Sequence, residues 1–307
     1  MLDVIAITLP IYLIIALGYG VIRSGYVAAG DIRATGKLVM RVALPAMIFL
    51  AISRSPISAV LRWDFVLAYL AGSLLVFGAG FALARRGLGQ ETPAAALVGM
   101  GMACSNSAFM GYPVAAMVVG GVALQAFTMA MLVENIVMIP LAVLLGDGTR
   151  AGGNGALRTT LTGIARNPLL IAVLAAVAFS LSGLALPGPL ERTLAMLAPV
   201  AAPIALLAVG GTVASLPFAA VAGPMPWVVA GKLIAHPLLV LAALSLATVP
   251  PDLRLAGVLI AAVPMMSIYA LFGHRWGQER LAASALVVAT VLSFFTISAM
   301  LFVLGKG

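Results

Sequence analysis

The chain has 307 residues, of which 63% are hydrophobic and only 8% are charged. Soluble domains carry roughly 25% charged residues, so a water-soluble fold of this size could not bury so much apolar surface. The apolar runs are about 20 residues long and do not alternate in polarity, which excludes a β-barrel and predicts an all-α integral membrane protein. The formal net charge is +8. Because the basic residues lie in short loops beside the apolar runs, no nucleic-acid partner is expected.

Ten hydrophobic segments of membrane-spanning length follow one another along the chain. They are predicted at 4–22, 34–53, 64–84, 93–118, 122–145, 167–186, 192–214, 225–248, 254–273 and 281–304. The longest connection includes the glycine-rich stretch 152–155, which predicts a flexible segment, and it divides the chain into two halves of five spans. An odd number of spans inverts the second half relative to the first, which predicts a 5+5 inverted repeat like that of many secondary transporters.

Lysine and arginine are distributed unevenly between the two sides of the predicted bundle. We number the loops between consecutive spans from the N-terminus. Ten of these basic residues lie in the odd-numbered loops, against five in the even-numbered loops and at the termini. The positive-inside rule therefore places the odd-numbered loops in the cytoplasm and both termini outside it. We expect a multi-pass protein of the cell inner (cytoplasmic) membrane, surrounded by the lipid bilayer.

The fourth and ninth spans each contain a predicted helix break. Span four carries Ser105 and Asn106 ahead of Pro113, and span nine carries Pro264. Proline removes a backbone donor, and unwound backbone at membrane depth is tolerated only against protein or a water-filled cavity. The N-terminus of each half-helix could then offer N–H groups to an anion; the alternative is a simple proline kink. The predicted substrate-binding residues are Ser105, Asn106, Pro113, Pro264, Met265, Ser267 and Tyr269.

Several motifs along the chain, taken together in order and spacing, resemble those of one transporter family. They are Ser105-Asn106 with 109–113, the stretches 41–45, 166–169 and 232–234, His236-Pro237, and Pro264 with 275–277. This pattern resembles the auxin efflux carrier family, which includes the plant PIN-FORMED carriers and bacterial carriers such as the malonate transporters. The resemblance implies a fold like those of the sodium/proton antiporters and bile-acid symporters, with crossed broken helices.

The resemblance also implies that some spans form a fixed scaffold and the others a mobile core. Scaffold helices would occupy 1–63 and 167–215, mobile core helices 64–146 and 216–307, and a cytoplasmic linker 147–166. The broken helices 93–118 and 254–273 would cross inside the core, which would move by elevator-type alternating access. Many relatives carry an asparagine shortly after the proline of span nine, where this chain has Ser267 and Ile268. A site with two asparagines is therefore not carried over, and the substrate stays undetermined.

Ionisable residues within spans are costly and indicate function by default. Glu134, beside Asn135, could take a proton or pair with a cation, or make a structural hydrogen bond. Lys232 could attract an anion or neutralise Glu134, although snorkelling to the cytoplasmic interface is the favoured interpretation. His236 is expected to be a hydrogen-bonded core residue. We expect no metal site and no cofactor, with coupling to H+ or Na+ left open.

These features together predict a secondary transporter that moves a small organic anion, of carboxylate or dicarboxylate type, and not an enzyme. A passive anion channel is the alternative, and a membrane-embedded enzyme is a weaker one. The sequence carries no Walker-type nucleotide-binding loop, so ATP is not the expected direct energy source. Small residues on span three, Gly72, Gly78 and Gly80, could allow close helix packing and leave a homodimer possible.

Overall fold

The computed structural model describes residues 2–54, 61–148, 152–216 and 223–304, and within these ranges it is built from helices. The helices of the first half are α1 (Leu2–Arg23), α2 (Ala29–Leu38), α3 (Leu44–Ser53), α5 (Trp63–Ala82), α6 (Thr92–Ala103), α7 (Tyr112–Val119), α8 (Val122–Val133) and α9 (Ile139–Gly148). Those of the second half are α10 (Gly152–Ala165), α11 (Pro168–Leu181), α12 (Gly188–Leu197), α13 (Ala201–Ser215), α14 (Met225–Ala230), α15 (His236–Leu246), α16 (Pro251–Ala262), α17 (Tyr269–Arg275) and α18 (Glu279–Val303). The all-α prediction is confirmed.

Within the described ranges, six continuous helical stretches are long and apolar enough to cross a membrane. They are Ala29–Ser53, Trp63–Gly87, Val122–Gly148, Gly188–Ser215, Met225–Leu246 and Glu279–Val303. A seventh candidate consists of two helices, Leu157–Ala165 and Pro168–Leu181, that meet at a bend of 51°. These stretches overlap predicted spans, but the count of ten and the 5+5 repeat stay predictions.

Both predicted breaks interrupt their helices. In the fourth segment, α6 ends at Ala103 and Cys104 is extended, with φ −99° and ψ 120°. In the ninth segment, α16 ends at Ala262, and Val263 is extended, with ψ 159°. Because a proline pushes the residue before it out of the helical region, Pro264 explains the second ending. The first break lies well before Pro113, so that proline does not cause it.

Four wide π-helical turns each end two residues before a proline. They are η1 (Val39–Ala43), η3 (Ser107–Gly111), η4 (Glu134–Met138) and η6 (Gly231–Ala235). The prolines that follow are Pro45, Pro113, Pro140 and Pro237. A proline lacks an N–H and its ring clashes with a carbonyl one turn earlier, and a wider turn lets the helix continue past it. The prediction that Pro113 breaks span four is therefore corrected: η3 absorbs this proline.

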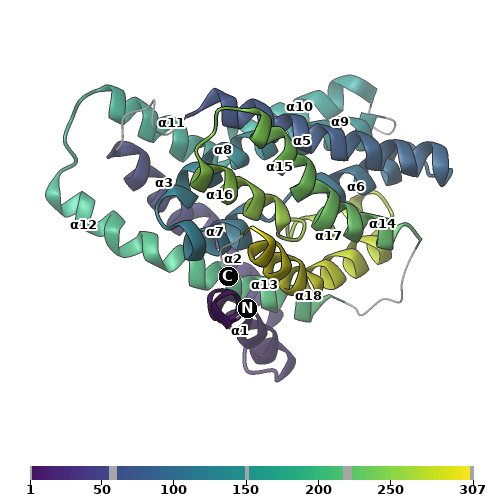
Figure 1. The fold of residues 1–307 in the computed structure, drawn as a ribbon, viewed down its shortest axis with the longest axis horizontal. Helices are drawn as coiled ribbons and strands as arrows, with labels where there is room; N and C mark the ends of the chain where they lie inside the picture. Colours follow the sequence, from purple (N-terminus) through teal and green to yellow (C-terminus); the bar gives the residue numbers. More distant parts are fainter. Residues whose placement is uncertain (1, 55–60, 149–151, 217–222, 305–307) are drawn as a thin grey trace.

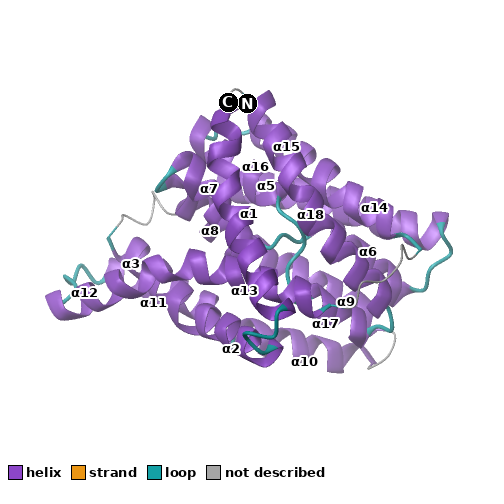
Figure 2. Cartoon of the chain, turned by 90° about the horizontal axis from the view of Figure 1, so that it is seen from below, coloured by secondary structure: helices purple, strands orange, loops and turns teal. Residues whose placement is uncertain are grey.

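The helices pack in two groups. In one group α1 and α2 pack on α13, and α3 packs on α11 and α12. In the other, α5 packs on α6 and α15, while α16 packs on α7, α8 and α15. Figures 1 and 2 show α3, α11 and α12 together at one side of the molecule and α6, α14 and α17 at the opposite side. The start of α1 and the end of α18 lie side by side (Figures 1 and 2).

The stretch between the two halves differs from its prediction. The glycines at 152–155 predicted a flexible linker, but α10 is helical from Gly152 and packs against α9. Tertiary packing therefore overrides the low helix propensity of glycine. Residues 149–151 of the predicted linker lie outside the described part. On span three, a Cβ at Gly72 would lie 2.9 Å from the Val240 backbone, so this glycine serves packing within the chain.

Close approach of α1 to α13 predicts a strong effect of one added methyl group. A Cβ at Gly18 would lie 2.2 Å from the backbone oxygen of Leu207. We expect Gly18→Ala to lower the free energy of unfolding by about 1–3 kcal/mol, the usual cost of overpacking. Gly20→Ala on the same helix is the matched control, because nothing lies within 4 Å of its Cβ position. Thermal unfolding in detergent micelles should separate the two variants, and equal midpoints would contradict this packing.

Candidate functional site

The two helix breaks lie against each other. The Asn106 backbone N–H donates to the Pro264 carbonyl at 2.9 Å, and Ser105 and Met265 form an isolated antiparallel bridge. The Asn106 side-chain amide lies 3.3 Å from the Ser267 hydroxyl, to which it donates. Five of the predicted binding residues therefore come together from segments about 160 residues apart.

A cavity of about 360 Å³ opens beside this crossing. Its polar wall is formed by Ser105, Asn106, Ser107, Glu134, Asn135 and Ser267, together with Arg166 and Asn167. Cavities of roughly 300–1,000 Å³ with a few convergent polar groups are the usual form of small-ligand sites. The cavity wall does not include Pro113, Pro264, Met265, Tyr269 or Lys232.

Glu134, the first residue of η4, is 3% exposed and closes the break in the fourth segment. One carboxyl oxygen accepts the Ser105 N–H at 3.0 Å, and the other accepts the Ser107 hydroxyl. The carboxyl group therefore faces the start of η3, where the helix carries partial positive charge. The predicted bare half-helix end is corrected, since a carboxyl of the protein itself already faces it.

Lys232, in η6, is fully buried with 0% of its surface exposed. Its Nζ donates to the Ala261 carbonyl at 2.6 Å and to the Ser105 hydroxyl at 2.8 Å. Ala261 lies in the last turn of α16, where carbonyls lack helical partners and carry partial negative charge. The favoured snorkelling interpretation was wrong, because the amino group points to the break and not to the membrane surface. Ser105 joins Glu134 and Lys232, since it contacts both.

The polar network continues from Lys232 to α5. The His236 Nδ1 lies 3.0 Å from the Lys232 Nζ, and the His236 Nε2 lies 3.0 Å from the Ser73 hydroxyl. His236 is fully buried, which confirms the prediction of a hydrogen-bonded core residue. Polar groups that are buried away from water need hydrogen-bond partners. These contacts provide partners for Lys232, His236 and Ser73 in the interior around the crossing.

Tyr269 lies behind the cavity and not in its wall. It is fully buried at the start of α17, and its hydroxyl would lie 2.6 Å from a Cβ on Gly101 of α6. The Tyr269 side chain therefore packs from α17 against α6 and does not line the cavity.

Two cavity residues were missed as site residues by the sequence analysis, Arg166 and Asn167. The Asn167 side chain caps α11 by accepting the Leu169 N–H at 2.9 Å, and it donates to the Asn135 side chain at 2.8 Å. An asparagine directly before a proline and an apolar run is a typical helix start. That signal predicts the cap, but no sequence pattern indicated that the cap would face Asn135.

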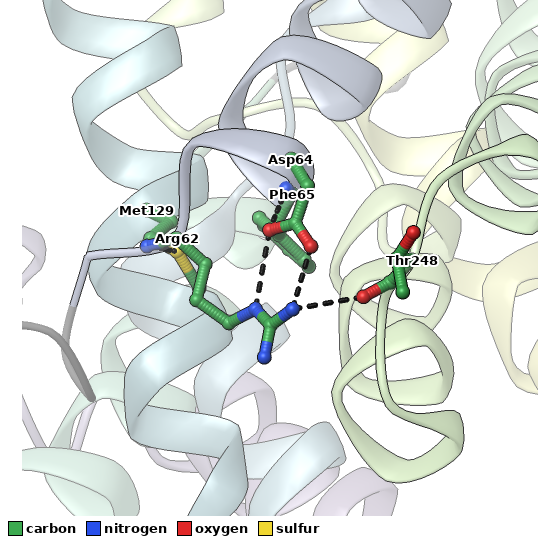
Figure 3. A network of polar contacts seen from close by, with 5 residues as sticks. All are labelled: Arg62, Asp64, Phe65, Met129 and Thr248. Atoms are coloured by element: carbon green, nitrogen blue, oxygen red, sulfur yellow. Dashed lines mark hydrogen bonds and ion pairs between the residues drawn. The ribbon is translucent and has the colours of Figure 1, made fainter.

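Polar clusters tie the two halves of the chain together at two further places. Arg62 binds Asp64, with Nη2 to Oδ2 at 2.6 Å, and donates to the Thr248 carbonyl at 2.8 Å (Figure 3). This links the start of α5 to the loop before α16. At the end of α9, Asp147 pairs with Arg275 and accepts the Trp276 indole N–H at 2.9 Å.

A helical chain with two broken segments that meet at a cavity with several polar groups in its wall is built like a membrane transporter. The chain belongs to the family described as "Membrane transport protein", which matches residues 3–152 and 156–301 and is the auxin efflux carrier family of the motifs above. It is a multi-pass membrane protein. It is 29% identical over 315 residues to a protein of Rhizobium meliloti (strain 1021) named "Putative malonate transporter", and the match covers 100% of this chain and 98% of that protein.

Proposed function

We propose that the protein is a secondary transporter that carries a small organic anion with one or two carboxylates. The observation that carries this proposal is the contact between the two breaks beside a cavity whose mainly apolar wall holds a few polar groups. There the Asn106 amide and the Ser267 hydroxyl, 3.3 Å apart, offer hydrogen-bond donors to a carboxylate. The name of the Rhizobium relative, which refers to malonate, supports the same class of solute.

The packing supports a scaffold and a moving core. Helices α1, α2, α3, α11, α12 and α13 contact one another most, and they correspond to the proposed scaffold. Arg62, two residues before the proposed core range 64–146, and Asp147, one residue after it, bind Thr248 and Trp276 of the core range 216–307. A core held together in this way can move as one body, which is what elevator-type alternating access in a 5+5 inverted repeat requires. In this proposal the inner membrane holds the chain with both termini outside the cytoplasm.

Glu134 supports coupling to a cation. Its carboxyl lines the same cavity that would receive the anion, and two negative charges at close range repel in a medium of low polarity. A proton or Na+ on Glu134 would remove this repulsion. We therefore propose that anion movement is coupled to H+ or Na+ at Glu134. Lys232, which contacts the same Ser105 as Glu134, would offset the negative charge of the Glu134 carboxylate.

Counterflow of radiolabelled malonate in proteoliposomes tests the function. Preloading with unlabelled malonate should accelerate uptake, and Asn106→Ala should reduce the initial rate about 10-fold or more, the effect of losing one or two hydrogen bonds to a charged group. Ser284→Ala is the matched control, because this buried hydroxyl donates to carbonyls of its own helix, at 2.8 Å and 3.2 Å. Uptake without counterflow would favour a channel, and full activity of Asn106→Ala would refute the site.

A further inference from the structure

Among the described residues, Arg166 is the one basic residue in the wall of the cavity, which it shares with Asn106 and Ser267. It lies at the bend of 51° between α10 and α11. Its side chain is exposed, and none of the ion pairs found in the described ranges involves it. The protein therefore leaves this guanidinium available to a bound solute.

The segment that carries Arg166 is held at the cavity from both sides. The Arg166 N–H donates to the Thr162 carbonyl at 3.1 Å and so closes α10. The next residue, Asn167, caps α11 and donates to Asn135 at 2.8 Å, one residue from Glu134. A guanidinium on an anchored backbone loses less freedom on binding than one on a mobile loop.

The wall of the cavity thus offers two kinds of anion contact. The crossing offers neutral donors, the Asn106 amide and the Ser267 hydroxyl. Arg166 comes from a different element and offers a planar cation, whose paired N–H groups fit a carboxylate. Lys232 does not duplicate this role, since it is buried and engaged with Ser105 and Ala261.

We propose that Arg166 binds the second carboxylate of a dicarboxylate whose first carboxylate lies at Asn106 and Ser267. Arg166 is then the residue that selects dicarboxylates over monocarboxylates. This inference rests on the proposed transport function and deepens it. A monocarboxylate would leave the guanidinium without a partner, so it would gain nothing from this residue.

The assignment is tested by measuring how well unlabelled competitors inhibit counterflow of labelled malonate. The measurement is made for wild type, Arg166→Gln, Arg166→Lys and the control variant Arg158→Gln. Arg158 is an exposed arginine on α10, and it does not line the cavity. The competitors are malonate and monomethyl malonate, which have similar size but differ by one carboxylate. Arg166→Gln should weaken competition by malonate about 10- to 100-fold, the range for a lost charge-assisted contact. Competition by the monoester should stay within about 2-fold, since it lacks the second carboxylate.

The other outcomes separate the two proposals. Arg166→Lys should fall between wild type and Arg166→Gln, because lysine keeps the charge and loses the paired geometry. Equal weakening of both competitors in Arg166→Gln, or an equal effect of Arg158→Gln, overturns the role of Arg166 and leaves the transport function intact. Failure of wild-type protein to exchange malonate or its monoester overturns the proposed function and this inference together.

Discussion

Replacement of Lys232 by methionine is expected to cost about 1–3 kcal/mol of unfolding free energy, the usual effect of leaving a buried hydrogen-bonding group without its partner. Methionine keeps the apolar stem but removes the donor to the Ala261 carbonyl at 2.6 Å and to the Ser105 hydroxyl at 2.8 Å. The carbonyl at the end of α16 then stays buried without its partner. Equilibrium unfolding in mixed detergent micelles measures the loss, and malonate counterflow should disappear with it.

A double variant tests whether Glu134 and Lys232 are energetically coupled through Ser105. Glu134 and Lys232 both contact Ser105, one through its N–H and one through its hydroxyl. Adding Glu134→Gln to Lys232→Met removes the opposing group, so the double variant should be more stable than the sum of the single effects predicts. Strict additivity, or a Lys232→Met protein as stable as wild type, would contradict the network described above.

Cross-linking of Asn135 to Asn167 should arrest transport. Their side chains meet at 2.8 Å, and they belong to the proposed core and scaffold, respectively. In a Cys104→Ser background, cysteines at both positions joined through disulfides by a short bis-methanethiosulfonate reagent would hold η4 against α11. We expect almost complete loss of malonate counterflow and its recovery after reduction, because elevator-type movement needs these elements to separate.

A second pair of cysteines provides the control for this experiment. Arg54 and Glu191 form an ion pair between the end of α3 and α12, and both belong to the proposed scaffold. The same reagent at this pair should leave counterflow close to that of the reduced protein. Continued transport by the cross-linked Asn135–Asn167 protein would exclude movement between these elements, whereas arrest at both pairs would point to general damage by the reagent.

The sequence was informative where local chemistry decides the backbone. Pro264 predicted an interruption in the ninth segment because proline restricts the residue before it, and Val263 is indeed extended. Ser105 and Asn106 predicted the polar break of the fourth segment. Pro113 misled the local interpretation, since a proline also fits a continuing helix when a π turn precedes it.

Partners distant in sequence could not be predicted from local pattern. Lys232 and Ser105 are 127 residues apart, and only the packing of η6 beside the crossing brings the amino group to the end of α16. Hydropathy gives the same value for a lysine that faces lipid and one that caps a neighbouring helix. Glycine propensity failed at Gly152 for a similar reason, because contacts with α9 decide the helix there.

The hydrogen bond from the Asn106 N–H to the Pro264 carbonyl has a thermodynamic consequence. It fastens the two interrupted segments to each other, so neither can shift alone without leaving buried backbone groups unsatisfied. In the proposed mechanism the two segments would therefore move together, and the contacts they offer to the solute would be the same on both sides of the membrane. The proposed carrier would then have no built-in direction, and the electrochemical gradients of the solute and of the proposed coupling ion would decide whether the cell accumulates or exports the anion.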